Sequence, residues 1–337
     1  MKNTKIRSFF DNTDQVQKIF SRFKSHGTFF FTALGKGVPF RELLLARFPF
    51  AFPDAPLPPS MHVEVTNACN LNCQYCNNHL FPYPRIMMNE EVFGKLLANL
   101  EQFKINRVCL GGGEPTLHPD FISYLERIRA RTRILTIVSN GQWNDDAIPR
   151  ALVRNNVDLI EVSVDTGGRE LYENSRIGAS YDRLKANLKK LVLFKRDYGS
   201  TSQINIRLMV RPSTEGLLRA ERKYWADYAD TVMPQFLIKL EEIDYATDLY
   251  YSDNVLPGHF PKCTLPFKNL QLRADGSVFL CQVSGSSIRE DKRLPLGNLR
   301  TSNIQELWNH PLLKKYREAH RAHLISAMPI CQGCKGS

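Results

Sequence analysis

The sequence lacks any apolar segment long enough to cross a membrane. Its 337 residues contain no run of ~18 apolar residues, the length that a spanning helix requires. The first twenty residues alternate charged residues with phenylalanine, so the hydrophobic segment of a signal peptide is missing too. The 43% hydrophobic and 23% charged residues exclude a mainly disordered chain. We therefore expect a cytoplasmic, folded protein without a transmembrane segment.

Two features of nucleic-acid-binding proteins are also absent: an arginine-rich run, and aromatic residues interleaved with basic ones. The formal net charge is nevertheless +11. Residues 1–60 hold 9 Lys/Arg against 4 Asp/Glu, and residues 260–337 hold 12 against 5. Two interpretations remain open, a solvated basic surface or an acidic partner such as a phosphorylated substrate or an electron carrier. Nucleic acid is the least expected partner.

The eight cysteines are grouped, and the first group is Cys69, Cys73 and Cys76. It directly follows a strand-like run over residues 61–67. In a cytosolic chain, such spacing favours metal or redox chemistry over disulfides. Three thiolates can hold three corners of a four-iron cluster and leave the fourth iron open. A structural zinc site with His79 as the fourth ligand is the alternative.

A second motif, Gly111-Gly-Gly-Glu114, ends another strand-like run that begins at Arg107. Glycine at a strand end lets the backbone approach a ligand closely. The two motifs together resemble those of the radical S-adenosylmethionine (SAM) enzymes, whose signature is C-x3-C-x-aromatic-C followed by a strand ending in Gly-Gly-Glu. Tyr75 supplies the aromatic residue, and the resemblance extends from about residue 60 onward.

Strand-like runs alternate with helical patterns through the middle of the chain, as in βα units. The expected strands are 61–67, 105–111, 133–139, 157–165, 203–211 and 234–241, and the expected helices include 89–103, 119–131 and 181–194. The resemblance implies an α/β fold: a partial (β/α)6 TIM-like barrel with a small C-terminal cysteine-rich twitch/SPASM-like domain. We expect an N-terminal cap or extension at 1–60, the barrel at 61–242 and the auxiliary iron–sulfur domain at 243–337.

Alternation within the strands predicts a polar barrel interior. Glu161, Ser163 and Asp165 share one strand face, and valines and an isoleucine occupy the other. The apolar face must cover the helices, so the polar face lines the lumen. The resemblance also implies contacts with SAM: the methionyl amino group near Gly112, Gly113 and Glu114, the ribose and carboxylate near Ser139, Asn140, Ser163 and Asp165, and an ion pair of the carboxylate with Arg176.

The last cysteines are Cys263, Cys281, Cys331 and Cys334. Asp275-Gly276 predicts a hairpin turn between residues 270–272 and 278–280. By themselves, four such thiolates fit a zinc ribbon and a four-iron cluster equally well. The resemblance favours an auxiliary 4Fe–4S cluster, which we expect to be the single one besides the SAM-binding 4Fe–4S cluster. Four cysteines saturate it, so it is expected to carry electrons.

These expectations favour oxidation of a small polar substrate, such as a sugar or aminocyclitol-like alcohol. The auxiliary cluster would take the second electron, and an acidic flavodoxin- or ferredoxin-type protein would donate electrons to the enzyme. Peptide side-chain modification and redox-neutral epimerisation are the alternatives. Candidates for the base facing the lumen are Arg207, Lys239, Glu241 and Glu161. Cys109 shares that face and is a hydrogen-atom donor for an epimerase or a small buried residue.

The N-terminal sixty residues allow two short amphipathic helices and a proline-rich lead into the barrel. A functional interpretation is a cap over the substrate or a contact with a membrane surface through Phe29–Phe31. The structural alternative is a segment that covers the open side of the core.

Overall fold

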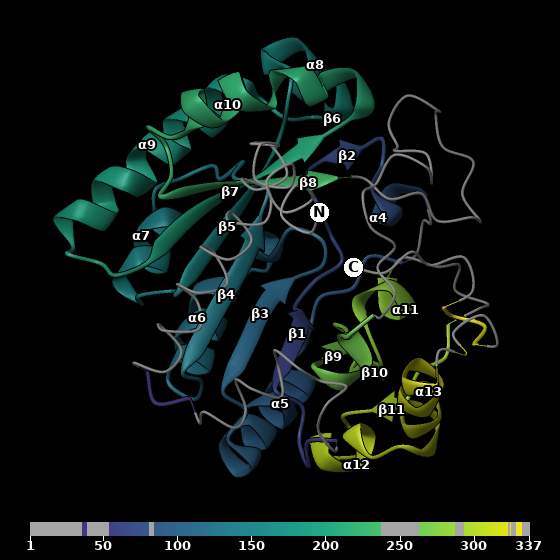
Figure 1. The fold of residues 1–337 in the computed structure, drawn as a ribbon. Coiled ribbons are helices and arrows are strands. Elements are labelled where there is room, and N and C mark those ends of the chain that lie inside the picture. The colour runs from purple at the N-terminus through teal and green to yellow at the C-terminus, as the bar shows by residue number, and fades with distance from the viewer. Residues whose placement is uncertain are drawn as a thin grey trace, which may run out of the picture.

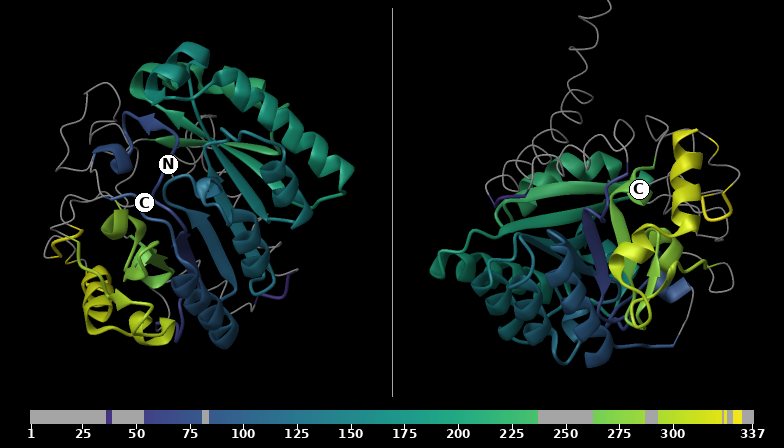
Figure 2. Two further views of the ribbon diagram at one scale, coloured as in Figure 1. Left: turned by 180° about the vertical axis from the view of Figure 1, so that it is seen from behind. Right: turned by 90° about the horizontal axis from the view of Figure 1, so that it is seen from below.

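The protein is described by a computed structural model that covers residues 36–38, 54–80, 84–236, 263–286, 293–322, 324 and 328–331. The structure contains a curved sheet with helices packed along its outside and a small C-terminal domain beside strand β1 (Figure 1). Two further views place the helices that connect the strands together on one side of the sheet (Figure 2). Three of the predicted site residues, Lys239, Glu241 and Cys334, lie outside the described residues.

The parallel strands of the sheet follow one another as predicted. They are β1 (Ser60–Glu64), β3 (Arg107–Gly111), β4 (Ile134–Ser139), β5 (Leu159–Asp165), β7 (Gln203–Val210) and β8 (Thr231–Phe236). The larger helices between them are α5 (Glu90–Phe103), α6 (Phe121–Arg129), α7 (Ala147–Arg154), α8 (Gly168–Ser175), α9 (Tyr181–Asp197) and α10 (Leu218–Trp225). The fold is therefore the predicted α/β architecture with a barrel-like parallel sheet.

The two faces of the sheet differ in polarity, as the alternation predicts. The face toward the helices consists of buried apolar side chains, among them Met61, Val63, Val108, Leu110, Leu135, Ile137, Ile160, Val162, Ile204 and Ile206. The other face carries polar side chains, among them His62, Glu64, Cys109, Glu161, Asn205 and Arg207, at alternating register positions. A closed barrel is normally filled with branched apolar residues, so a polar interior favours a polar ligand.

The last strand of the barrel starts earlier than predicted. The sequence predicts a strand from residue 234, whereas β8 begins at Thr231. The Thr231 hydroxyl donates to Asn205 Oδ1 at 2.9 Å, and Asp230 N donates to Ile204 O at 2.9 Å. These bonds pair β8 with β7 three residues before the position at which the apolar pattern of the sequence predicts the strand. The predicted end of the strand lies outside the described residues.

The C-terminal domain continues the barrel sheet, a feature that the sequence does not predict. Its first strand, β9 (Asn269–Leu272), pairs in parallel with β1, and β10 (Ser277–Phe279) and β11 (Gly297–Asn298) follow antiparallel. The predicted hairpin turn is confirmed, with Gly276 at φ +87°. The helices are α11 (Gln282–Ser286), α12 (Ile304–Trp308) and α13 (Pro311–Arg321). The domain is thus built onto the edge of β1 instead of being joined by a linker alone.

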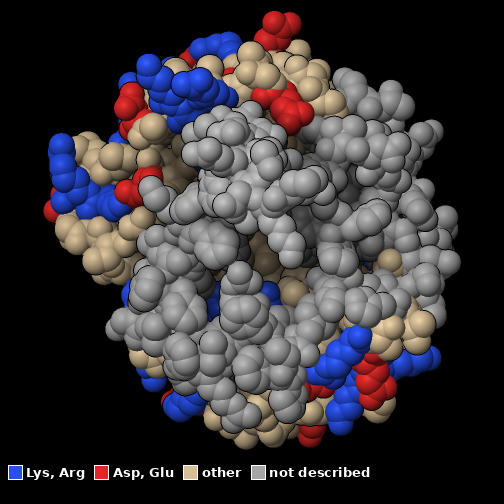
Figure 3. Space-filling view, viewed as in Figure 1, with Lys and Arg blue, Asp and Glu red and all other residues tan. Residues whose placement is uncertain are grey.

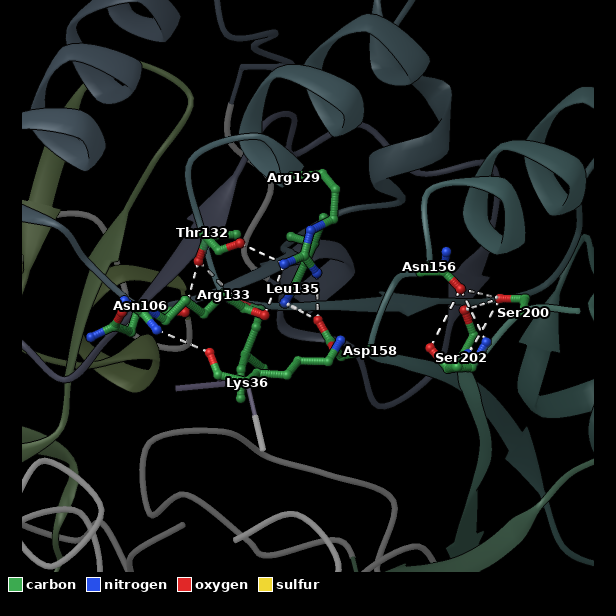
Figure 4. Close-up of polar contacts among 12 residues, drawn as sticks. Lys36, Asn106, Arg129, Thr132, Arg133, Leu135, Asn156, Asp158, Ser200 and Ser202 are labelled. Carbon is green, nitrogen blue, oxygen red and sulfur yellow. Dashed lines mark hydrogen bonds and ion pairs between the residues drawn. The ribbon is translucent and has the colours of Figure 1, made fainter. Parts of the chain in front are cut away.

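A charged network lies at the amino ends of β4 and β5 (Figure 4). The Asp158 carboxylate accepts hydrogen bonds from Arg129 Nη1 at 2.6 Å and from Leu135 N at 2.8 Å. It also pairs with Lys36, whose carbonyl oxygen accepts a bond from Arg133 Nη1 at 3.0 Å. This network fixes residues 36–38 to the barrel.

The position of residues 36–38 bears on the N-terminal cap expected from the sequence. These residues contact the amino ends of the strands, whereas the first three cysteines follow the carboxyl end of β1. This part of the extension therefore lies at the end of the barrel away from the cysteines and does not cover a substrate there. The predicted helices and Phe29–Phe31 lie outside the described residues.

Replacing Asp158 should destabilise the fold. Its carboxylate is buried, with 3% of the side chain exposed, and Asp158→Ala would leave Lys36 and Arg129 without their carboxylate partner. We expect a loss of about 3 kcal/mol in the free energy of unfolding, measured by urea denaturation. Glu91→Ala, which removes the exposed partner of Arg300, is the control and should leave the unfolding midpoint unchanged. An unchanged midpoint for Asp158→Ala would contradict the structural role of the network.

Candidate functional site

The loop that carries Cys69, Cys73 and Cys76 is held by a two-stranded ribbon. Strand β2 (Asn72–Cys73) pairs antiparallel with β6 (Arg176–Ile177), which places Cys73 opposite Arg176. Gln74 N donates to Ser175 O at 3.0 Å, and helix α4 (Asn77–Leu80) follows the last cysteine. The ribbon fixes the cysteine loop above the carboxyl end of β5, because β6 lies just beyond that strand in the chain.

The thiols of this loop are close together and embedded among hydrogen-bond donors. Cys69 Sγ accepts from Leu71 N at 3.4 Å and from Asn140 Nδ2 at 3.8 Å, as a thiolate sulfur would. Burial raises the pKa of Cys69 to about 11 and that of Cys73 to about 12, and neighbouring thiols raise both further. Arg176 opposes the rise at Cys73. A bound metal would remove this cost, because coordination stabilises the thiolate.

The donor set fits an iron–sulfur cluster better than a single metal ion. In the described part of the chain, no three His, Cys, Asp or Glu side chains converge as ligands of one ion. A four-iron cluster binds each thiolate to a different iron, so its cysteines stand apart while sharing one cluster. None of the described cysteines forms a disulfide. The side chain of His79, the fourth ligand of the zinc site considered from the sequence, lies outside the described side chains.

Hydrogen bonds hold the Gly-Gly-Glu segment against residues 66–68, which precede the cysteine loop. Gly113 N donates to Thr66 O at 3.1 Å, and Glu114 N donates to Ala68 O at 2.7 Å. A Cβ atom on Gly113 would lie 2.2 Å from Ala68 O. Gly112 has φ +115°, and a Cβ there would lie 2.4 Å from Glu64 Cγ. Gly113 is thus required by close backbone packing and Gly112 by its positive φ, and the packing at Gly113 sets the position of the cysteine loop.

Gly113→Ala should displace the cysteine loop without unfolding the protein. The added methyl group meets the backbone of Asn67 and Ala68, so the segment must shift. We expect about 100-fold slower formation of 5′-deoxyadenosine from SAM after reduction, since misplacing a reacting group by ~1 Å has effects of that size. Gly94→Ala is the matched control, because a Cβ at that helical position meets nothing within 4 Å. Equal rates for the two variants would refute the role of Gly113.

Glu114 joins the carboxyl ends of β3 and β4. Its buried carboxylate accepts from Ser139 Oγ at 2.9 Å, Asn140 N at 2.7 Å and Thr116 Oγ1 at 2.6 Å. Burial raises the pKa of Glu114, and these hydrogen bonds oppose the rise. The structure thus brings Glu114, Ser139 and Asn140 together, as expected from their places at strand ends. The carboxylate itself is satisfied within the protein.

Asp165 is the centre of a buried polar cluster at the end of β5. Its carboxylate accepts from Tyr75 OH and Arg176 Nε, each at 2.7 Å, and from Ser175 Oγ. Arg211 Nη2 lies 3.4 Å from its second oxygen. The resemblance implies that Asp165 lies near the ribose of SAM and that Arg176 pairs with the SAM carboxylate. In the structure the two residues pair with each other, and Tyr75 connects them to the cysteine loop.

The lumen face of β5 and β7 carries an ion pair. Arg207 Nε lies 2.6 Å from Glu161 Oε1, and Asn205 Nδ2 donates to the same oxygen at 3.0 Å. Burial and the Glu161 charge raise the pKa of Cys109 to about 12, and the Arg207 charge opposes the rise. Ser163 is half-buried at the register position of Arg207. These four predicted residues therefore lie on one face, as the alternation indicates.

Sequence reasoning missed two lumen residues, His62 and Gln271. They lie opposite each other on β1 and β9, and both are buried. Burial lowers the pKa of His62 to about 4, and a hydrogen bond with Gln271 opposes the fall. A buried polar pair on the lumen face favours a polar ligand or water as its remaining partner. Only the pairing of β1 with β9, which the sequence does not predict, brings them together.

The later cysteines gather at the end of β10 and after α13. Cys281 is buried, and its Sγ accepts from Ser284 N at 3.4 Å. Cys331 Sγ lies 3.4 Å from His320 Nε2. Cys263 is half-buried at the start of the domain, and Cys334 lies outside the described residues. Sequence reasoning identified these cysteines but missed His320, which has no local motif.

Comparisons with known proteins agree with this site. A search with family models matches the radical SAM superfamily over residues 63–206 and the iron–sulfur cluster-binding SPASM domain over residues 263–335. A tungsten-containing aldehyde ferredoxin oxidoreductase cofactor-modifying protein from Pyrococcus furiosus is 29% identical over 313 residues, 81% of this chain and 86% of that protein. A GTP 3′,8-cyclase from Limosilactobacillus fermentum is 28% identical over 130 residues, 37% of this chain and 39% of that protein.

Solved structures share the fold. BtrN in complex with AdoMet and 2-DOIA is similar with a TM-score of 0.55 at 14% identity, covering 83% of this chain and 93% of BtrN. The anSMEcpe structure with bound AdoMet has a TM-score of 0.59 at 18% identity, covering 81% and 88%. In the described residues, no helix has the length and apolarity needed to cross a membrane. The chain belongs to the radical SAM superfamily and is a radical SAM enzyme with a SPASM domain, whose cofactors are SAM, a 4Fe–4S cluster and an auxiliary iron–sulfur cluster.

Proposed function

We propose that this radical SAM enzyme oxidises a hydroxyl-bearing carbon of a small polar substrate, such as a sugar or aminocyclitol-like alcohol. The observation that carries the proposal is the polar lumen face, which holds the buried His62–Gln271 pair and the Glu161–Arg207 ion pair. Such a surface can hold hydroxyl groups by hydrogen bonds, whereas an apolar substrate would leave it unsatisfied. We place the extension at 1–60, the barrel at 61–242 and the auxiliary domain at 243–337.

Cys69, Cys73 and Cys76 would hold the SAM-binding cluster. The strand ends of β3, β4 and β5 would bind SAM through Gly112, Gly113, Glu114, Ser139, Asn140, Ser163, Asp165 and Arg176. Bound SAM supplies a 5′-deoxyadenosyl radical, which abstracts a hydrogen atom. In this protein Tyr75 orients the cysteine loop by its hydrogen bond to Asp165.

The oxidation of an alcohol to a ketone removes a hydrogen atom, a proton and an electron. Glu161 is the described lumen carboxylate placed to accept the proton, and Asn205 and Arg207 orient it. Arg207 itself does not serve as the base, because a guanidinium is not deprotonated in proteins. Lys239 and Glu241 remain candidates from the sequence, outside the described residues.

Cys263, Cys281, Cys331 and Cys334 would hold a single auxiliary 4Fe–4S cluster that accepts the electron. The placement of Cys281 supports this role. Helix α11, which follows Cys281, packs over the lumen side of β9, where a Cβ on Gly285 would lie 2.9 Å from Gln271 Cγ. Cys281 therefore directly precedes a helix that contacts the lumen residue Gln271.

The positive charge supports an acidic electron donor of the flavodoxin or ferredoxin type. The chain has a net charge of +11, and Lys and Arg side chains gather over the region of α9 and α10 (Figure 3). Electrostatic steering accelerates association at low ionic strength and fades with added salt. A flavodoxin should therefore reduce the enzyme several-fold faster in low salt than in high salt.

The experiment for the proposed reaction is an anaerobic assay with a panel of polyols and aminocyclitols. We expect one equivalent of 5′-deoxyadenosine for each ketone formed, detected by mass spectrometry. Glu161→Gln keeps the shape of the side chain but removes the base, so ketone formation should fall while iron content stays unchanged. The absence of ketone from every substrate that stimulates 5′-deoxyadenosine formation would refute the proposal.

One observation favours a second function, redox-neutral epimerisation. Cys109 lies on the lumen face and is half-buried, where a thiol could return a hydrogen atom to a substrate radical. In that case the product would carry solvent deuterium at an sp3 carbon, and Cys109→Ala would block turnover. Modification of a peptide or protein side chain is the remaining alternative, and labelled peptide products in place of ketones would identify it.

A further inference from the structure

His320 is a buried histidine in contact with one of the proposed cluster ligands. It lies in the last turn of α13 and is fully buried, and its Nε2 is 3.4 Å from Cys331 Sγ. The segment containing Cys331 is fixed against the helix, since Ile330 N donates to Tyr316 OH at 3.4 Å. The contact therefore belongs to a well-packed interface between α13 and the segment that follows it.

The direction of the hydrogen bond follows from the partners of the two ring nitrogens. His320 Nδ1 is buried and has no hydrogen-bond partner. A proton on that nitrogen would be an unsatisfied buried donor, which is more costly than an unused lone pair. The proton of the neutral ring therefore lies on Nε2, and the N–H group donates to the sulfur of Cys331.

A second thiol in the same region also accepts an N–H donor. Ser284 N donates to Cys281 Sγ at 3.4 Å. Cys281 and Cys331 both lie near Tyr316, whose pKa is raised by burial and by the charges of the two cysteines. One donor is a backbone amide, which every substitution except proline leaves in place, whereas the donor from His320 is a side chain. The effect of the His320 donor can therefore be measured separately from that of the backbone amide.

We propose that His320 is a positioning residue of the auxiliary cluster, whose N–H donates to the Cys331 thiolate and raises the reduction potential of the cluster. A hydrogen bond to a ligand sulfur withdraws negative charge, and the reduced cluster, being the more negative form, gains more from it. The inference rests on the proposed function in that Cys331 is taken as a cluster ligand. A higher potential would make the cluster a better acceptor of the second electron.

The test is a redox titration monitored by electron paramagnetic resonance. It uses the full chain with Cys69, Cys73 and Cys76 replaced by Ala, so that only the auxiliary cluster contributes to the signal. His320→Phe and His320→Leu remove the N–H donor, whereas His320→Gln retains one. We expect about a tenfold shift toward the oxidised cluster in the two apolar variants, which is ~59 mV for a one-electron couple. The Gln variant should stay near the potential of the parent protein.

Three results would overturn the proposal. One is an unchanged potential in the apolar variants, and another is a Gln variant whose potential falls as far as theirs. The third is loss of auxiliary iron from variants that circular dichroism shows to be folded, because that would make His320 a ligand. The titration contains neither SAM nor substrate. The measured effect of His320 on the potential would therefore hold even if alcohol oxidation were not found. Likewise, an unchanged potential in the His320 variants would not refute alcohol oxidation.

Discussion

Replacing Cys69, Cys73 and Cys76 by Ala should abolish 5′-deoxyadenosine formation and remove about four irons from the reconstituted protein. The three thiols lie on one ribbon-held loop, and burial raises the pKa values of Cys69 and Cys73 because it disfavours an unliganded thiolate. The auxiliary cluster is held by four other cysteines, so it should persist in this variant. Iron analysis and mass spectrometry of the reaction mixture measure the two effects independently.

The matched control for the cysteine variant is Cys109→Ala. Cys109 is a half-buried cysteine on the lumen face and belongs to neither proposed ligand set. Its replacement should leave the iron content unchanged. The account of the first cluster would be wrong if the triple variant still released 5′-deoxyadenosine, or if Cys109→Ala lost as much iron.

The second large effect is expected for Asp165→Ala. The carboxylate is fully buried, and the side chains of its partners Arg176 and Arg211 are 5% and 6% exposed. Removing the carboxylate leaves two buried guanidinium groups without their main countercharge, a change that typically costs about 3–5 kcal/mol. Because Tyr75 and Arg176 connect this cluster to the cysteine loop, the variant should also fail to load the first cluster.

Asp182→Ala is the control for that prediction, since the Asp182–Arg169 ion pair is exposed. Its unfolding midpoint and iron content should match those of the wild type. Urea unfolding and iron analysis of both variants check the prediction. Wild-type stability together with full iron loading in Asp165→Ala would show that the buried cluster does not hold the loop.

The sequence predicts the barrel strands well because they carry a long-range pattern. In β5 and β7, apolar residues alternate with polar ones, so strand, face and lumen follow from periodicity alone. The β2–β6 ribbon escapes prediction because each of its strands has two residues, too few to show a period. The pairing of β9 with β1 escapes it because the partners lie more than two hundred residues apart in the chain.

The sequence predicts those parts of the site that are carried by short sequence motifs. The cysteine spacings and the Gly-Gly-Glu segment identify both cluster regions, and strand ends identify Ser139 and Asn140. His62 and Gln271 became visible only through the pairing of distant strands, and His320 only through the packing of α13. The mutual pairing of Asp165 and Arg176 likewise depends on tertiary contacts that spacing does not encode.

The metal content of the wild-type protein after anaerobic reconstitution tests the central claim most directly. Two clusters, one held by three cysteines and one by four, predict about eight irons per chain and no zinc. About four irons with one equivalent of zinc at the C-terminal cysteines would contradict the account. The auxiliary domain would then have a structural role, and the proposed oxidation would have no cluster to accept the second electron.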